Sequence, residues 1–188
     1  MTLFEYLSVA TSIVLSLSAA QLLSSLRSVL DPARRYWVHT LWVFVVLLLH
    51  LNIWWEFWGY RVEVDWNFAK FALMLLNPGI LFVCSNVLVS LESGEKNAWD
   101  SHFFEVSGLF FAALLMLPVV SVLRRWVLAD IAILSPGNFA EIFLFIPLYA
   151  VACLSRSRRG HAVIVLVNCL FFAISIAYVW FQPGAVLN

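Results

Sequence analysis

The polar side chains that could do chemistry are concentrated in residues 50–58, inside a long apolar stretch. His50, Asn52 and Glu56 lie there beside three tryptophans, and helical spacing places Asn52 and Glu56 on the same stripe. An ionisable group in a membrane-spanning helix costs about 2.5 to 3.5 kcal/mol at the helix centre, so it needs a partner or water. We therefore expect these three side chains to form part of a polar layer.

The next apolar stretch supplies candidate partners for this layer. Folding the chain about Glu63, in the middle of the short connection, places residues equally far from Glu63 at similar depths. This reflection predicts an ion pair between Glu56 and Lys70. It also brings His50 close to Asn77, so a buried His50 is expected to bond to Asn77 or to a backbone carbonyl. Two interpretations follow: a proton or ion path, or structural contacts that fix the register of the two helices.

The composition indicates the kind of elements that position these groups. Of the 188 residues 63% are hydrophobic and 12% are charged, and the mean hydropathy is +0.94. Several apolar stretches reach about 20 residues, the length that crosses a hydrocarbon core about 30 Å thick. The sequence therefore predicts an all-α fold, a polytopic bundle of transmembrane helices.

Six spans are expected, and no linker divides them, so residues 1–188 are expected to form a single transmembrane domain. Five spans are the alternative, because residues 126–134 are apolar but too short to cross and carry Asp130. That stretch fits either an interfacial turn or an extension of the fourth span. The six expected spans are residues 3–26, 36–60, 66–91, 102–123, 139–154 and 161–181.

A kink is expected in the third span at Pro78 and Gly79. Proline removes a helix hydrogen bond and glycine loosens the next turn, so the carbonyl of Met74 would lose its partner. A free carbonyl could bind a cation or water, as in transporters with broken helices, although kinks also occur in bundles without a ligand. Pro118 and Pro147 are expected to kink the fourth and fifth spans.

A row of small residues follows the first span at every fourth position, and such rows let helix backbones approach closely. Three interpretations are open: tight packing inside the bundle, an interface between subunits, or a water path lined by hydroxyl groups. The row consists of Ser8, Ser12, Ser16, Ala20 and Ser24.

The charges bear on partners and orientation. Eleven basic and eleven acidic residues give a net charge of zero, which argues against a nucleic acid partner and leaves membrane lipids as the surroundings. The connections after spans one, three and five hold seven basic residues, so the positive-inside rule places both termini outside the cytoplasm. Arg124 and Arg125 count against this orientation. We expect a bacterial inner membrane.

No cofactor, metal site or catalytic motif is expected. The four histidines lack metal-ligand spacing, the three cysteines lie unpaired in apolar sequence, and no nucleophile or nucleotide motif occurs. A protein of the transport class, a channel or small carrier for a proton, ion or small solute, is the leading hypothesis, as a homo-oligomer if water must pass. The alternatives are a structural or regulatory subunit on a larger membrane partner, or a lipid-binding membrane protein.

Overall fold

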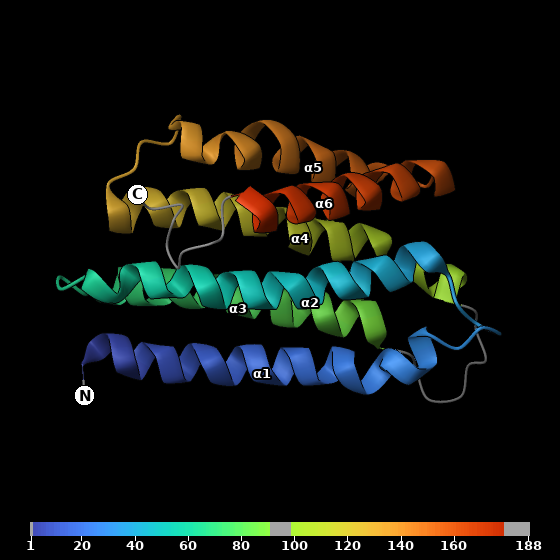
Figure 1. Cartoon of the computed structure of the whole chain (residues 1–188), viewed down its shortest axis with the longest axis horizontal. Helices are drawn as coiled ribbons and strands as arrows, with labels where there is room; N and C mark the ends of the chain where they lie inside the picture. The colour runs from blue at the N-terminus through green and yellow to red at the C-terminus, as the bar shows by residue number, and fades with distance from the viewer. Residues whose placement is uncertain (1, 91–98, 179–188) are drawn as a thin grey trace.

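The computed structural model describes residues 2–90 and 99–178, and Figure 1 shows them as a bundle of long helices. The predicted ends of the third and sixth spans, at residues 91 and 181, and Lys96 lie outside this part. The elements are α1 (Leu3–Val29), α2 (Trp37–Phe57), the 3-10 helix η1 (Trp58–Val62), α3 (Phe68–Val89), α4 (Trp99–Ala129), the 3-10 helix η2 (Pro136–Asn138), the π-helix η3 (Ala140–Phe145), α5 (Ile146–Leu154) and α6 (Arg158–Tyr178).

Six helical segments of the described residues are long and apolar enough to cross a membrane, which confirms the all-α fold class and six spans instead of five. The ambiguous stretch after the fourth span extends α4 to Ala129. Asp130 follows with a φ of 52°, a left-handed conformation that stops a helix. The chain then returns into the bundle through η2 and η3. The connection therefore lengthens the fourth span at one end and begins the fifth span at the other.

Polar residues define several helix starts. At α1 the Thr2 side chain accepts from the Glu5 amide and the Glu5 carboxylate accepts from the Thr2 amide, which together form a capping box. At α3 the Asn67 side chain accepts from the Lys70 amide at 3.0 Å. These caps satisfy amide groups that no earlier turn can bond, so the helices begin where the sequence turns from polar to apolar.

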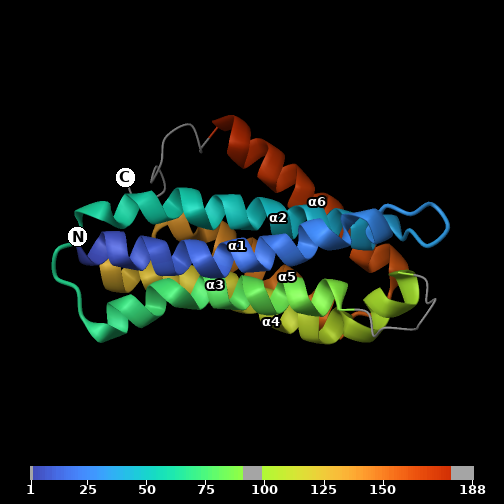
Figure 2. The same ribbon diagram turned by 90° about the horizontal axis from the view of Figure 1, so that it is seen from below.

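The helices are arranged with α1 at one edge of the bundle, where it packs on α2 and α3 (Figures 1 and 2). Next along, α3 packs on α4, and α4 packs on α5. On the other side α6 lies against α2 and, over a smaller area, against α5. Spans two and three, and five and six, are therefore neighbours, as their short connections predict.

The bundle centre is aromatic and aliphatic. Trp42, Phe110 and Phe111 are fully buried there with their rings 5.0 to 5.5 Å apart, in edge-on arrangements that aromatic rings favour. The outward faces are apolar as well, with Leu51 67% exposed and Leu170 63% exposed. A helix that is apolar on every side fits a lipid surrounding.

The proline positions behave differently from one another. Helix α3 continues through Pro78, and its first turns slant away from the line of the rest in Figure 2. The kink expected there is met in part, because α3 remains one continuous helix. Pro147 comes just after the π-helix η3, which ends at Phe145. Pro147 has no amide hydrogen, so one carbonyl in the preceding turn lacks its helical hydrogen bond. The wider π-helix is one way to accommodate that loss.

Candidate functional site

Glu56, in the last turn of α2, forms an ion pair with Arg124 near the end of α4. Arg124 Nη2 donates to Glu56 Oε2 at 2.8 Å, and the arginine side chain is 1% exposed. The Arg124 guanidinium carbon also lies 5.3 Å from the centre of the Tyr60 ring, within cation–π range. This pair ties α2 to α4 where both helices end.

The predicted ion pair between Glu56 and Lys70 is therefore wrong. Lys70 Nζ instead donates to Glu63 Oε1 at 2.8 Å, across the short connection between α2 and α3. Reflection about the connection fixes depth along the helices but leaves their rotation free. Helix α2 is rotated so that Glu56 faces α4. A carboxylate partner stabilises the buried Arg124 guanidinium there more than it would stabilise Lys70, which is partly exposed.

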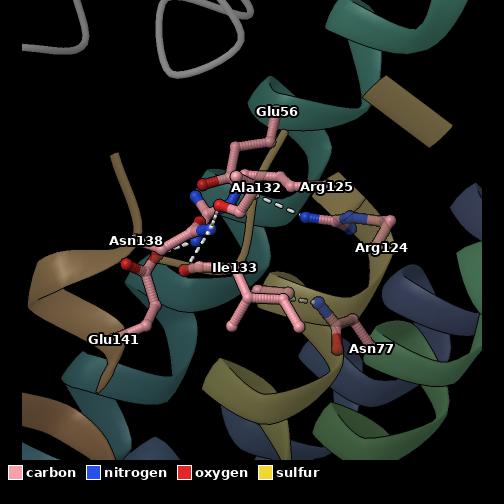
Figure 3. A network of polar contacts seen from close by, with 9 residues as sticks. Glu56, Asn77, Arg124, Arg125, Ala132, Ile133, Asn138 and Glu141 are labelled. Carbon is pink, nitrogen blue, oxygen red and sulfur yellow. Dashed lines mark hydrogen bonds and ion pairs between the residues drawn. The ribbon is translucent and has the colours of Figure 1, made fainter. Parts of the chain in front are cut away.

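A second buried pair stands next to the first one. Arg125, 2% exposed, donates to the carboxylate of Glu141, which lies in the first turn of the π-helix η3. The connection between them is fixed by Asn138, whose side-chain amide donates to the carbonyls of Ala132 and Ile133 at 3.1 and 3.0 Å (Figure 3). The chain after α4 is thus folded back so that Glu141 meets Arg125.

A cavity of about 440 Å³ opens beside these pairs, among α2, α3, α4, η2, η3, α5 and α6. A volume of this size is typical of small-molecule sites. Its apolar lining includes Leu49, Ile53, Leu117, Phe145, Phe171 and Phe172. Its polar lining includes Asn52, Glu56, Asn77, Ser121, Arg125, Glu141, Tyr149 and Ser175.

Three of the five candidates for the polar layer border this cavity: Asn52, Glu56 and Asn77. Asn77 donates to Ser121 Oγ at 3.0 Å, so α3 and α4 are joined at the cavity wall (Figure 3). Pro78 follows Asn77 inside α3, and an added Cβ at Gly79 would meet no atom within 4 Å. A larger residue would therefore fit at position 79, and no close helix contact depends on Gly79.

Of the two partners expected for a buried His50, the contact with Asn77 is wrong and the contact with a backbone carbonyl is confirmed. His50 Nδ1 lies 2.7 Å from the Val46 carbonyl oxygen and Nε2 lies 2.7 Å from Ser18 Oγ. A carbonyl only accepts, so Nδ1 carries a proton and donates to Val46. Ser18 also contacts Ser85 Oγ at 2.8 Å, which joins α1, α2 and α3.

A serine beside a histidine is the arrangement of a nucleophile and its base, but burial decides against that chemistry here. Ser18 and Ser85 are fully buried and His50 is 5% exposed, and none of them borders the cavity. A nucleophile needs room for a reacting carbonyl within contact distance. We therefore interpret the three side chains as a structural hydrogen-bonded chain between helices.

The row of small residues on α1 faces away from the bundle over most of its length. Ser8 and Ser12 are half-buried, and Ser12 accepts from Trp54 Nε1 at 3.3 Å. Ser16, Ala20 and Ser24 are exposed. The buried face of α1 is formed by Leu7, Thr11, Leu15, Ser18 and Leu22. Packing inside the bundle is therefore limited to the Ser8 and Ser12 end of the row, and the exposed part of the row is free to meet lipid or another chain.

The sequence reasoning missed the most deeply buried charges, Arg124 and Arg125. They had been assigned to the connection after the fourth span, whereas α4 carries both inside the bundle. The signal was present, because two arginines in an otherwise apolar stretch require carboxylate partners if that stretch is helical. The structure supplies Glu56 and Glu141 as these partners.

The opposite end of the bundle holds histidines packed in aromatic rings. His39 stacks on Trp99 with centroids 4.5 Å apart, and His161 stacks on Phe111 at 5.1 Å. The Leu88 carbonyl oxygen lies 2.9 Å from His39 Nε2 and 3.2 Å from a nitrogen of the His102 ring. These rings fill the space between helix ends, and none borders the cavity.

The fold and the polar site together are consistent with a multi-pass helical membrane protein that has a partly open cavity between its helices. No protein-family model matches the chain, and no curated protein or solved structure matches it either. The geometry of the site therefore carries the functional argument alone.

Proposed function

We propose that this protein belongs to the transport class and acts as a small carrier whose solute binds in the cavity. The single observation that carries the proposal is the cavity itself, which has charged pairs on one wall and lies within helices suited to a membrane. The cavity of about 440 Å³ is partly open, and the carboxylates and the Arg125 side chain on its wall offer charged and hydrogen-bonding groups to a small solute.

A carrier accounts for the arrangement better than an open channel does. Between the cavity and the histidine end the core consists of large apolar side chains, among them Trp42, Phe110, Phe111 and Leu114, all fully buried. Such side chains give no hydration to an ion. A solute that enters the cavity would then cross only if the helices around it rearrange, which is the behaviour of a carrier.

The proposed orientation keeps both termini outside the cytoplasm, in a bacterial inner membrane. In the count of basic residues, Arg124 and Arg125 oppose this orientation. Both are buried within α4 and paired with carboxylates, so neither lies in an exposed connection. The exposed arginines near the other end, including Arg35, Arg156 and Arg159, then carry the positive-inside argument. In this orientation the polar wall of the cavity lies towards the outside.

Site-directed labelling in sealed vesicles tests the carrier. In a background with Cys84, Cys153 and Cys169 replaced by alanine, Ser175→Cys places a thiol at the cavity. A carrier exposes this thiol to a membrane-impermeant maleimide from either side in turn. The matched control is Ser85→Cys, which lies in the sealed contacts between α1 and α3.

The outcome is read as a ratio of labelling rates. We expect Ser175→Cys to react faster than Ser85→Cys from each side, and to do so without a steady leak of protons. Reaction at the same slow rate as Ser85→Cys would contradict a carrier. A proton leak that labelling blocks would indicate a channel instead.

A structural or regulatory subunit is the second candidate, favoured by the outward position of Ser16, Ala20 and Ser24 on α1. Small residues on a lipid-facing helix permit close contact with another helix, in a second copy or in a larger partner. Disulfide cross-linking of Ser16→Cys in native membranes tests this candidate. A cross-linked band absent from a Leu109→Cys control, on the exposed side of α4, would favour an interface on α1.

A further inference from the structure

We propose that the cavity takes an uncharged amphiphile, a molecule with an apolar chain and a hydroxyl- or amide-type head. This inference rests on the proposed function, because it names the class of solute that the carrier would bind. It follows from the charge balance of the wall, from the hydrogen-bonding groups that the wall leaves unused, and from the aromatic side of the cavity.

The charges at the cavity cancel. Glu56 and Glu141 each carry one negative charge and border the cavity, Arg125 carries one positive charge and borders it, and Arg124 neutralises Glu56 from behind. Each arginine is thus already matched by one carboxylate. An ionised head would bring a charge without a counter-charge into a poorly hydrated space, and this is costly.

The lining residues also hold unused hydrogen-bonding capacity of both kinds. Among the described residues, Asn52 Nδ2 and Arg125 Nε are buried donors without a partner, and Asn77 Oδ1 and Glu141 Oε2 are buried acceptors without one. These atoms are covered in the structure, so binding requires the side-chain ends of Asn52, Asn77 and Glu141 to turn about their last bonds, whose torsions are broad, when a ligand enters. A head that both donates and accepts matches this set, as a hydroxyl or an amide does.

The remaining wall suits an apolar chain. Phe145, Phe171 and Phe172 stand on α6 and at the end of η3, and Leu49, Ile53 and Leu117 complete this side. Burial of a chain against these residues supplies the favourable part of binding, whereas the polar wall fixes the position of the head.

Photolabelling tests the class of head at constant chain. The probe is decanol carrying a photoreactive diazirine, applied to the whole protein in vesicles, and the labelled residues are mapped by peptide mass spectrometry. Excess decanol, ionised decanoate or decyltrimethylammonium then competes with the probe. We expect decanol to compete best, with the two ions about tenfold weaker, because each ion must leave water unpaired.

Variants sharpen the test. Glu141→Gln removes one negative charge at the cavity, and decanoate should then compete about as well as decanol, whereas Glu105→Gln, an exposed carboxylate on α4, should change nothing. Ser175→Phe fills the cavity and should abolish cavity labelling, whereas Ser16→Phe, on the exposed side of α1, should leave it intact. Asn52→Leu, which changes no charge, should weaken decanol competition even if Glu141→Gln fails to fold.

The outcomes separate this inference from the carrier. Equal competition by all three heads would overturn the uncharged amphiphile and leave the cavity as a binding site. Labels confined to the outward faces of the helices would overturn the inference as well, and the Ser175→Cys accessibility result then decides the carrier independently. Preferential competition by decanol that Glu141→Gln removes for decanoate supports the uncharged amphiphile, and the Ser175→Cys result decides the carrier.

Discussion

At the residue scale, two ion pairs of equal length differ in their surroundings. Arg124 with Glu56 and Arg158 with Asp100 both have a nitrogen–oxygen distance of 2.8 Å. The side chains of the first pair are 1% and 18% exposed, and those of the second pair 66% and 31%. Water screens the second pair and hardly reaches the first, so their contributions to stability differ although their geometry does not.

Arg124→Met should lower the free energy of unfolding by about 3 to 5 kcal/mol, because it leaves the Glu56 carboxylate without its buried partner. Adding Glu56→Gln should recover most of this loss, since the double variant removes both charges. Equilibrium unfolding in mixed micelles, followed by tryptophan fluorescence, measures both values.

Arg158→Met is the matched control for that experiment. Its effect should stay below about 1 kcal/mol, as for other exposed ion pairs. An equal loss in the two arginine variants would show that burial does not govern these pairs.

Ser18→Ala should destabilise the protein by about 1 kcal/mol, the size of hydrogen bonds between helices in membranes. It removes the hydroxyl that contacts His50 Nε2 and Ser85 Oγ but does not touch the cavity. Unfolding in micelles measures the loss, and decanol photolabelling should remain unchanged. A change in labelling would return His50 to the functional candidates.

The sequence was sufficient to show that Glu56 needs a partner, but it did not identify that partner. Hydropathy reports the depth of a residue along a span and contains nothing about rotation of one helix against another. Lys70 has the right depth for Glu56, and rotation alone determines that Glu56 turns to Arg124. The same limit explains why the predicted contact between His50 and Asn77 was wrong.

At the scale of elements, α3 and the segment from η3 to α5 depart most from a regular helix. Pro78 stands inside α3, and the π-helix η3 places Glu141 opposite Arg125. A π-turn holds more residues than an α-turn, so it changes the direction of every side chain in it. The cavity lies between these two irregular elements.

Pro78→Ala should straighten α3 by restoring the missing backbone hydrogen bond. Spin labels at Ala69 and Val83, both exposed positions on α3, report its length through their separation. We expect a longer separation in the variant, closer to the straight-helix value of about 1.5 Å per residue. An unchanged separation would mean that the slant of the first turns has another cause.

The presence of the six spans was easier to predict than the backbone geometry within each span. Apolar length alone identified all six spans, because a membrane permits few alternatives to a helix. The π-helix was not predicted, although Pro147 had marked the fifth span as irregular. Local sequence shows that a backbone bond is missing, but only the packing around Glu141 decides how the helix accommodates the loss.

At the scale of the whole molecule, the two ends of the bundle are chemically different. One end holds the buried pairs of Arg124 and Arg125 beside the cavity, and the other holds His39 and His161 among aromatic rings. The arginines that are exposed lie mostly towards the histidine end. An asymmetric distribution of this kind sets the direction in which a membrane protein inserts.

Alkaline phosphatase fusions check the resulting orientation. The enzyme should be active when fused at the C-terminus and inactive when fused after Ser157, in the connection between α5 and α6. Activity at Ser157 together with inactivity at the C-terminus would reverse the orientation. The labelling experiments do not depend on it, because they compare both sides.

Helix α4 has 31 residues, so at 1.5 Å per residue it is about 46 Å long. Hydrocarbon cores are about 30 Å thick, and whole bilayers about 40 to 45 Å. A thin bilayer must tilt this helix further than a thick one. The last turns of α4 carry Arg124 and Arg125, so a change of tilt would move both arginines relative to Glu56 and Glu141. We therefore expect the affinity of the cavity for its ligand to depend on lipid chain length.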